Sequence, residues 1–139
     1  MNPGTEADRS RALLKVWWIL WAAILCTLVT VYGAVGLAKL PASAPHPNPF
    51  ANLVGLVPLF VSIIIRWLVL PRYNEIRQAF PLFVAGLALA EGCGFLGIFL
   101  GGPYRDDLFA LGVLGIVQFV PFFAKSYLEP RPQGFIPNN

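Results

Sequence analysis

One carboxyl side chain, Glu91, lies inside a long apolar stretch of this sequence. The stretch runs from Pro81 to Gly101 and otherwise contains apolar residues and glycines. A carboxyl group at the centre of a bilayer is costly when it is charged, and it faces protein or water more often than lipid. Glu91 is therefore the first candidate for a functional group, and a proton or a cation is the ligand that it could bind.

A second polar side chain, Gln118, lies on the next apolar stretch, and we take Glu91 and Gln118 together as the candidate ion-binding site. Both are about equally far from the turn near Arg105, on the order of 20 Å at the helical rise of 1.5 Å per residue. Glu91 could be a neutral hydrogen-bond donor to Gln118, a group that binds and releases an ion, or the base of an intramembrane enzyme. No histidine, second carboxylate or activated nucleophile lies at a comparable depth, so we expect no catalytic residues and no enzyme activity.

Small residues recur at helical spacing along the same stretch. Gly86, Ala90 and Gly94 follow one another every four residues, as do Gly97 and Gly101. At this interval small side chains share one face of a helix and let a second helix backbone approach closely in lipid. The pattern predicts a tight helix–helix contact, either within one chain or between copies.

Metal and haem chemistry have no support in the sequence. Cys26 and Cys93 both lie in apolar stretches, where a free cysteine behaves as a small hydrophobic residue. The chain has one histidine, His46, in a proline-rich connector, and no CxxC pattern. Because haem and copper sites need clustered ligands of these types, we expect no metal site and no cofactor.

The composition is that of a membrane protein. Of the 139 residues, 57% are hydrophobic and only 12% are charged, against about a quarter charged in an average soluble domain. The net charge of +3 would suggest nucleic acid only if the basic residues gathered on a polar face, whereas they lie at the ends of apolar stretches. We expect the lipid bilayer as the partner, no nucleic acid, and assembly into a homo-oligomer or a larger membrane complex.

Four apolar stretches are each long enough, at about twenty residues, to cross a bilayer as a helix. They cover about residues 16–38, 52–70, 80–101 and 108–124. The fold class predicted is all-α, an integral membrane bundle of four transmembrane helices, and its domain covers residues 1–128. Residues 129–139 are a proline-rich tail without an apolar period, which we expect to be mobile.

Tryptophan and arginine mark the predicted membrane boundaries. Near the basic start of the first span lie Trp17, Trp18 and Trp21, and indole rings favour the headgroup region of a bilayer. Arg66 and Trp67 lie near the end of the second span, where the guanidinium group can extend to the interface. We predict that these five side chains anchor the two helices.

Lysine and arginine are distributed unequally between the two sides of the predicted bundle. One side has eight of them: Arg9, Arg11, Lys15, Arg66, Arg72, Arg77, Lys125 and Arg131. The other side has only Lys39 and Arg105. The positive-inside tendency places both termini in the cytoplasm, an N-in/C-in topology. The expected location is the bacterial inner (plasma) membrane, crossed several times.

The third stretch carries the pattern Gly86-x-Ala88-x-x-Glu91-x-x-Gly94-Phe95-x-Gly97. It resembles the ion-carrying helix of the c subunits (proteolipids) of rotary ATPases, in which a helix of small residues carries a mid-membrane acidic residue. The resemblance implies that Glu91 is the ion carrier and that Gly86, Ala88 and Gly94 allow close packing beside it. In four-span members of that family the acidic residue belongs to the last span, whereas here it belongs to the third. The overall layout is similar to small four-span bacterial membrane proteins, which implies no activity.

Two functional hypotheses follow from the sequence. The first is a non-catalytic integral membrane protein that acts as a packing or assembly subunit through its glycine-rich third span. The second is a proton- or cation-translocating membrane protein that uses Glu91. The residues within reach of Glu91 distinguish them, because a dry pocket closed by Gln118 favours the first and a water-connected cavity the second.

Overall fold

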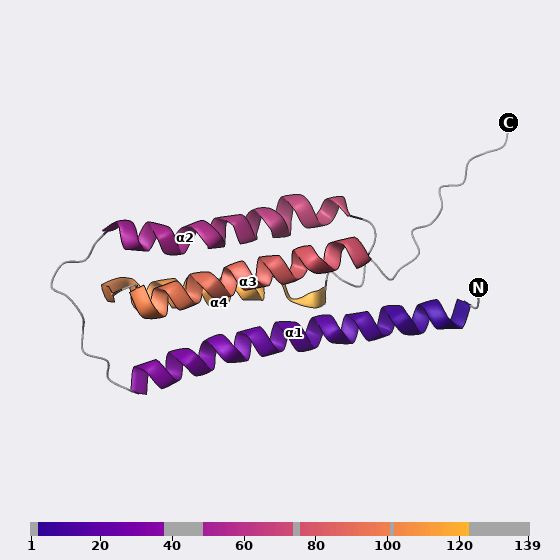
Figure 1. Ribbon diagram of the computed structural model, residues 1–139, viewed down its shortest axis with the longest axis horizontal. Helices are drawn as coiled ribbons and strands as arrows, with labels where there is room; N and C mark the ends of the chain where they lie inside the picture. Colours follow the sequence, from indigo (N-terminus) through magenta and orange to yellow (C-terminus); the bar gives the residue numbers. More distant parts are fainter. Residues whose placement is uncertain (1–2, 38–48, 74–75, 101, 123–139) are drawn as a thin grey trace.

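A computed structural model describes residues 3–37, 49–73, 76–100 and 102–122. Within them the chain forms four α-helices (Figure 1): α1 (Pro3–Leu37), α2 (Pro49–Ile64), α3 (Ile76–Leu100) and α4 (Arg105–Val117). Three short turns complete the structure, the π-helical η1 (Ile65–Val69) and the 3₁₀-helical η2 (Leu70–Arg72) and η3 (Gly102–Tyr104). Every regular element in the described residues is helical, which confirms the predicted all-α class.

Three of these helical segments are long and apolar enough to cross a membrane. They are Arg11–Val35, Val54–Arg72 and Gln78–Leu100, with 25, 19 and 23 residues, against the roughly 20 that a bilayer requires. They cover most of the first three predicted spans. The second includes Pro58 within its helix. By length and composition, the protein is a small multi-span membrane protein.

Helix α4 differs from the predicted fourth span. The sequence predicted a span over residues 108–124, but α4 begins at Arg105 and ends at Val117. The cause is Pro121, which has no N–H to donate to the Val117 carbonyl; the N–H of Val120 donates to it instead, at 3.0 Å. With 13 residues, α4 is about 20 Å long, shorter than the roughly 30 Å hydrocarbon core of a bilayer.

Helix α3 lies at the centre of the bundle and contacts the other three α-helices. Figure 1 shows α1 and α2 on opposite sides of the α3–α4 pair. α1 and α3 run in the same direction, and α2 and α4 run in the opposite one. We call the end where α1 and α3 begin the N-terminal end, and the end where α4 begins the Tyr104 end. The predicted tail at 129–139 and the C-terminal side of the predicted topology lie outside the described residues.

A tight turn joins α3 to α4 at the Tyr104 end. Gly102 has a φ of 49°, a left-handed conformation that glycine adopts without a steric penalty. The 3₁₀ turn η3 follows directly and leads into α4. The two helices therefore form an antiparallel hairpin, and their contact fixes where the central residues of α3 lie.

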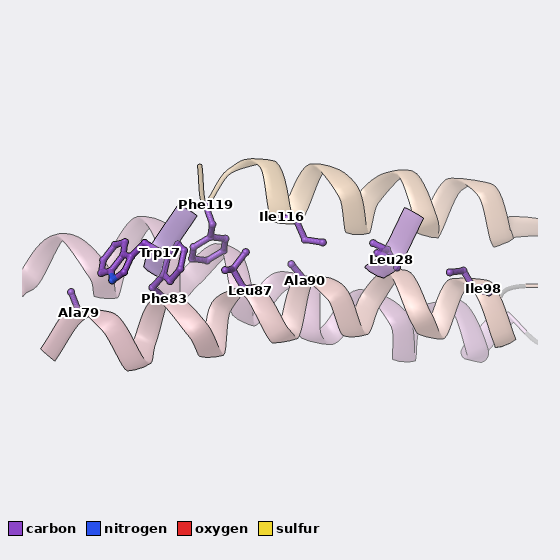
Figure 2. Packing of buried hydrophobic residues seen from close by; sticks show 9 residues of the cluster. All are labelled: Trp17, Leu28, Ala79, Phe83, Leu87, Ala90, Ile98, Ile116 and Phe119. Atoms are coloured by element: carbon purple, nitrogen blue, oxygen red, sulfur yellow. The ribbon is translucent and has the colours of Figure 1, made fainter. Parts of the chain in front are cut away.

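The main core lies along α3, between α1 and α4. Figure 2 shows its fully or almost fully buried side chains: Trp17, Leu28, Ala79, Phe83, Leu87, Ala90, Ile98, Ile116 and Phe119. Trp17 of α1 stacks on Phe83 of α3, with ring centroids 4.4 Å apart. A second, smaller cluster of Leu59, Cys93 and Leu108 connects α2 to the α3–α4 pair. Trp17 and Leu28 thus join α1 to α3, and Ile116 and Phe119 face the same core from the α4 side.

Candidate functional site

The closest approach in the bundle is between the backbones of α3 and α4. A Cβ atom built on Gly112 would lie 2.7 Å from both the N and the Cα atoms of Gly94. One turn further along α4, a Cβ on Gly115 would lie 3.0 Å from the Cβ of Ala90. No side chain larger than hydrogen fits at Gly112 unless the helices separate. The glycines on both helices therefore permit a backbone contact of the kind that small residues allow in membrane proteins.

Gly86, Gly94 and Gly97 of α3 also lie against larger side chains of the same chain. The ring of Phe119 covers Gly86, and a Cβ atom on Gly97 would lie 2.5 Å from the Cβ of Leu108. A Cβ on Gly94 would also lie 2.7 Å from two methyl carbons of Leu28 on α1. Gly86, Ala90, Gly94 and Gly97 thus all face neighbours within the chain, and Gly101 lies outside the described residues.

Beyond Val117, the chain uses side chains from other helices to satisfy the backbone of α4. The Ile116 carbonyl accepts hydrogen bonds from the N–H of Phe119 at 3.0 Å and from Nε1 of Trp21 at 2.9 Å. The Gln118 carbonyl accepts one from Nε of Arg66 at 2.8 Å. In a bilayer, free carbonyls must find such partners within the protein. The cationic guanidinium also suits the negative end of a helix dipole.

Four polar side chains gather at this point and form what we call the Gln118 cluster: Ser62, Arg66, Trp67 and Gln118. The side-chain amide of Gln118 accepts a hydrogen bond from Nε1 of Trp67 at 3.2 Å and donates one to Oγ of Ser62 at 3.4 Å. The hydroxyl of Ser62, which is fully buried, donates to the Gly86 carbonyl at 2.8 Å. The cluster therefore joins α2, α3 and the end of α4.

The π-helical turn η1 explains how two consecutive residues reach Gln118. The N–H of Leu70 donates to the carbonyl of Ile65, five residues earlier, which widens this turn relative to an α-helix. Arg66 and Trp67 both lie in the widened turn, and the Arg66 guanidinium lies over the Trp67 ring at 5.2 Å. The sequence suggested that Arg66 extends to the membrane interface; in the structure it is half-buried and binds the end of α4.

Glu91 lies on a different side of α3 from this cluster. Leu87 and Phe95, one turn before and after it, both belong to the core that α3 shares with α1. On α1, Trp17 contacts Phe83 of α3, and Leu28 contacts Gly94 of α3. The two α1 residues are separated by 11 residues along their helix, as are the two α3 residues, so the two helices stay in the same register between them.

This constant register places Glu91 at the level of Leu25 on α1, an apolar residue. Glu91 is half-buried, and its carboxyl group has no hydrogen bond or ion pair with any residue that the structure describes.

The structure does not bring Glu91 and Gln118 together. Phe119 lies over Gly86, so the end of α4 is more than one helical turn of α3 nearer to the N-terminal end than Glu91 is. Both polar atoms of the Gln118 side chain are engaged by Ser62 and Trp67. Among the described residues, Gln118 therefore does not close a pocket over Glu91, which is one of the two arrangements that the sequence left open.

The three tryptophans of α1 have different surroundings. Trp17 is fully buried in the core, stacked on Phe83, rather than at the surface where an interface anchor would lie. Trp21 donates a hydrogen bond to the backbone of α4. The ring of Trp18 packs edge-on against the ring of Trp21, with centroids 5.8 Å apart. Trp18 also packs edge-on against Phe122, at 5.3 Å. These rings attach α1 to the bundle as well as lying near its basic end.

A second polar contact, at the Tyr104 end, was missed by the sequence analysis. The hydroxyl of Tyr32 on α1 donates to Oδ1 of Asp106 on α4 at 2.8 Å, although 74 residues separate them. The Tyr32 ring stacks on Phe109 at 3.8 Å, and the Arg105 guanidinium lies 5.2 Å from its centroid. No local motif pairs such distant residues, so only the fold reveals this contact.

The described residues contain no group of three or more histidine, cysteine, aspartate or glutamate side chains that could hold a metal ion. Cys26 is exposed and Cys93 is buried, and both are free thiols. Comparison of the chain with protein-family models, curated proteins and solved structures gives no match. The fold and the site therefore define a class, a multi-span helical membrane protein, and Glu91 is the group that a specific function has to explain.

Proposed function

We propose that this protein is a non-catalytic integral membrane protein that acts as an assembly subunit. In this proposal α1, α2 and the α3–α4 hairpin are embedded in a bacterial inner membrane, and α4 with residues 118–122 forms the fourth crossing. The N-terminal end faces the cytoplasm, supported by the basic residues Arg11, Lys15, Arg66 and Arg72 near that end against Arg105 near the other.

One observation carries the proposal, the unpartnered carboxyl group of Glu91. It lies within the segment Gln78–Leu100, which is apolar and long enough to cross a membrane. A charged carboxyl at the centre of a membrane helix costs about 2.5–3.5 kcal/mol on insertion scales. Gly86, Gly94 and Gly97 are already covered by other parts of the chain, whereas Glu91 remains partly exposed. A binding partner would supply the contact that the chain does not.

The test compares the size of the native complex in two variants at one position. The tagged full chain is produced in the cells that naturally make it, extracted in mild detergent and run on a native gel. Glu91→Gln should keep the wild-type complex because its amide still forms hydrogen bonds, whereas Glu91→Leu should reduce the complex to the single chain.

Thr27→Val is the matched control. It also removes a polar group at membrane depth, but the Thr27 hydroxyl bonds within its own helix, to the Ala23 carbonyl at 2.9 Å. An unchanged complex in Glu91→Leu would contradict the proposal.

The same observation also favours a second candidate function, proton or cation translocation. A carboxyl group without an ion pair can bind and release a proton or cation, as the resemblance to rotary c subunits implies. Purified protein in proteoliposomes with an internal pH dye should then show ion flux that Glu91→Gln abolishes. Equal flux in wild type and Glu91→Gln would contradict translocation while leaving the assembly proposal intact.

A further inference from the structure

We propose that the face of α3 around Glu91 binds a transmembrane helix of another protein, and that this helix carries a lysine or arginine at the depth of Glu91. The inference rests on the proposed function and specifies the partner of the same carboxyl group.

An open surface of α3 adjoins Glu91. Pro81, Ala85 and Ala88 are exposed, and a Cβ atom built on Gly92 would meet nothing within 4 Å. The spacing of these four residues places them on one side of the helix, next to Glu91. Their side chains are short, so a second helix can come close enough for its side chains to reach the carboxyl group. This open surface lets a second helix approach α3, and the carboxyl group of Glu91 determines which helix binds there.

The chain's own cations at the N-terminal end lie at the wrong depth to pair with Glu91. Ser62 contacts the Gly86 carbonyl, and Arg66 lies a further turn towards the N-terminal end. The backbone of Arg66 is therefore about two and a half helical turns of α3 away from the level of Glu91. Arg11 and Lys15 precede Trp17, which lies level with Phe83, and so they are also near that end.

The cation at the opposite end is equally distant. Leu108 contacts Gly97, and Arg105 lies almost one turn beyond it towards the Tyr104 end. A second copy of the chain inserted in the same orientation would place each of these cations at the same wrong depth. In that orientation the backbones of Arg11, Lys15, Arg66 and Arg105 of a second copy all lie away from the level of Glu91. In this proposal the cation that pairs with Glu91 therefore belongs to a different protein.

A cation is favoured over a neutral donor because of the surroundings of Glu91. Its neighbours on α1 and α3 are apolar, and the attraction between opposite charges is strongest where the dielectric constant is low. Ionisable residues inside membranes typically pair with one another. Neutral interhelical hydrogen bonds contribute only weakly to helix association in membrane proteins, so they give little selectivity between partners.

The experiment measures energy transfer between the dye-labelled full chain and labelled single-span peptides in phosphatidylcholine vesicles. The peptides consist of leucine and alanine with one central lysine, one lysine moved two turns from the centre, or one central leucine. The central-lysine peptide should bind wild type about tenfold more tightly than the leucine peptide, as expected for a close charge pair. The displaced lysine should bring no gain.

Variants of Glu91 then test the charge. Glu91→Gln should lose most of the preference for central lysine, and Glu91→Lys should instead prefer a peptide with a central glutamate. Circular dichroism shows which variants fold, and Glu91→Gln keeps the test decisive if Glu91→Lys does not. Equal affinity of wild type for the lysine and leucine peptides would overturn the inference. Energy transfer between two labelled copies that disappears in Glu91→Leu would also overturn it, by assigning the face to a second copy.

The native-gel experiment distinguishes failure of the cationic-partner inference from failure of the proposed assembly function. A native complex that depends on Glu91, together with no preference for the lysine peptide, rejects the cationic partner and keeps the assembly role. A native complex that is unaffected by Glu91→Leu rejects both.

Discussion

On its α4 side, helix α3 meets backbone atoms, whereas on its α1 side it meets the ends of large side chains. Gly94 and Gly112 bring the backbones of α3 and α4 together, and this contact fixes the position of one helix relative to the other. Trp17 and Leu28 instead reach across from α1 to α3. A close backbone contact allows no substitution, while a contact through long side chains can adjust. Glu91 lies on the adjustable side, where a new partner requires the least change in the bundle.

The largest expected effect comes from breaking the backbone contact. Gly112→Leu places a side chain where the Gly94 backbone lies 2.7 Å from the Cβ position, and overpacking of this kind costs about 3 kcal/mol or more. The free energy of unfolding, measured by titration with SDS in mixed micelles, should fall by that amount.

Gly33→Leu is the control for this substitution. A Cβ atom at Gly33 meets nothing within 4 Å, so the free energy of unfolding should change by less than about 0.5 kcal/mol. If Gly112→Leu and Gly33→Leu lower the free energy of unfolding equally, the backbones of α3 and α4 are not in unusually close contact.

A smaller effect is expected where α1 attaches to the end of α4. Trp21→Phe keeps an aromatic ring but removes the hydrogen bond to the Ile116 carbonyl. The loss should be about 1 kcal/mol, the usual net value of one hydrogen bond. Steric trapping in bicelles measures it, with Trp18→Phe as the control because Trp18 contributes ring contacts. If Trp18→Phe lowers the free energy of unfolding more than Trp21→Phe does, the ring contacts of Trp18, and not the hydrogen bond of Trp21, attach α1 to the end of α4.

The smallest effect is expected at the Tyr104 end. Tyr32→Phe removes the hydrogen bond to Asp106 but keeps the stacking on Phe109. Because this bond is exposed, the cost should be about 0.5 kcal/mol, at the low end for hydrogen bonds. Thermal unfolding followed by circular dichroism compares it with Tyr104→Phe, which removes a hydroxyl from an exposed ring nearby. If the two variants melt at the same temperature, the hydrogen bond from Tyr32 to Asp106 does not stabilise the contact between α1 and α4.

The helices themselves could be predicted from the sequence, because apolar length is a strong signal. Three segments that could cross a membrane coincide with predicted spans. The predicted fourth span continues past Pro121. The helix ends earlier, because a helix ends several residues before a proline when other side chains can satisfy the freed carbonyls.

The candidate site was harder to predict, since it depends on how each helix is rotated about its axis. A helix that is apolar on all sides has no polar face to indicate its rotation. Glu91 and Gln118 were paired from depth alone, whereas in the structure they lie on different sides of the bundle. The π-helical turn that directs Arg66 towards Gln118 adds a local rotation that no spacing rule anticipates. Because Phe119 lies over Gly86, Gln118 is also nearer to the N-terminal end than Glu91, so the predicted equal depth of the two residues was not found either.

The early end of α4 has a consequence for how the chain enters the membrane. A helix of 13 residues is too short to be stable across a bilayer by itself. It fits only when α3 lies beside it, joined through the turn at Gly102. We therefore expect the insertion machinery to release α3 and α4 together, as one hairpin. Separating them with a long polar linker should leave α4 on the side of the membrane where its synthesis began.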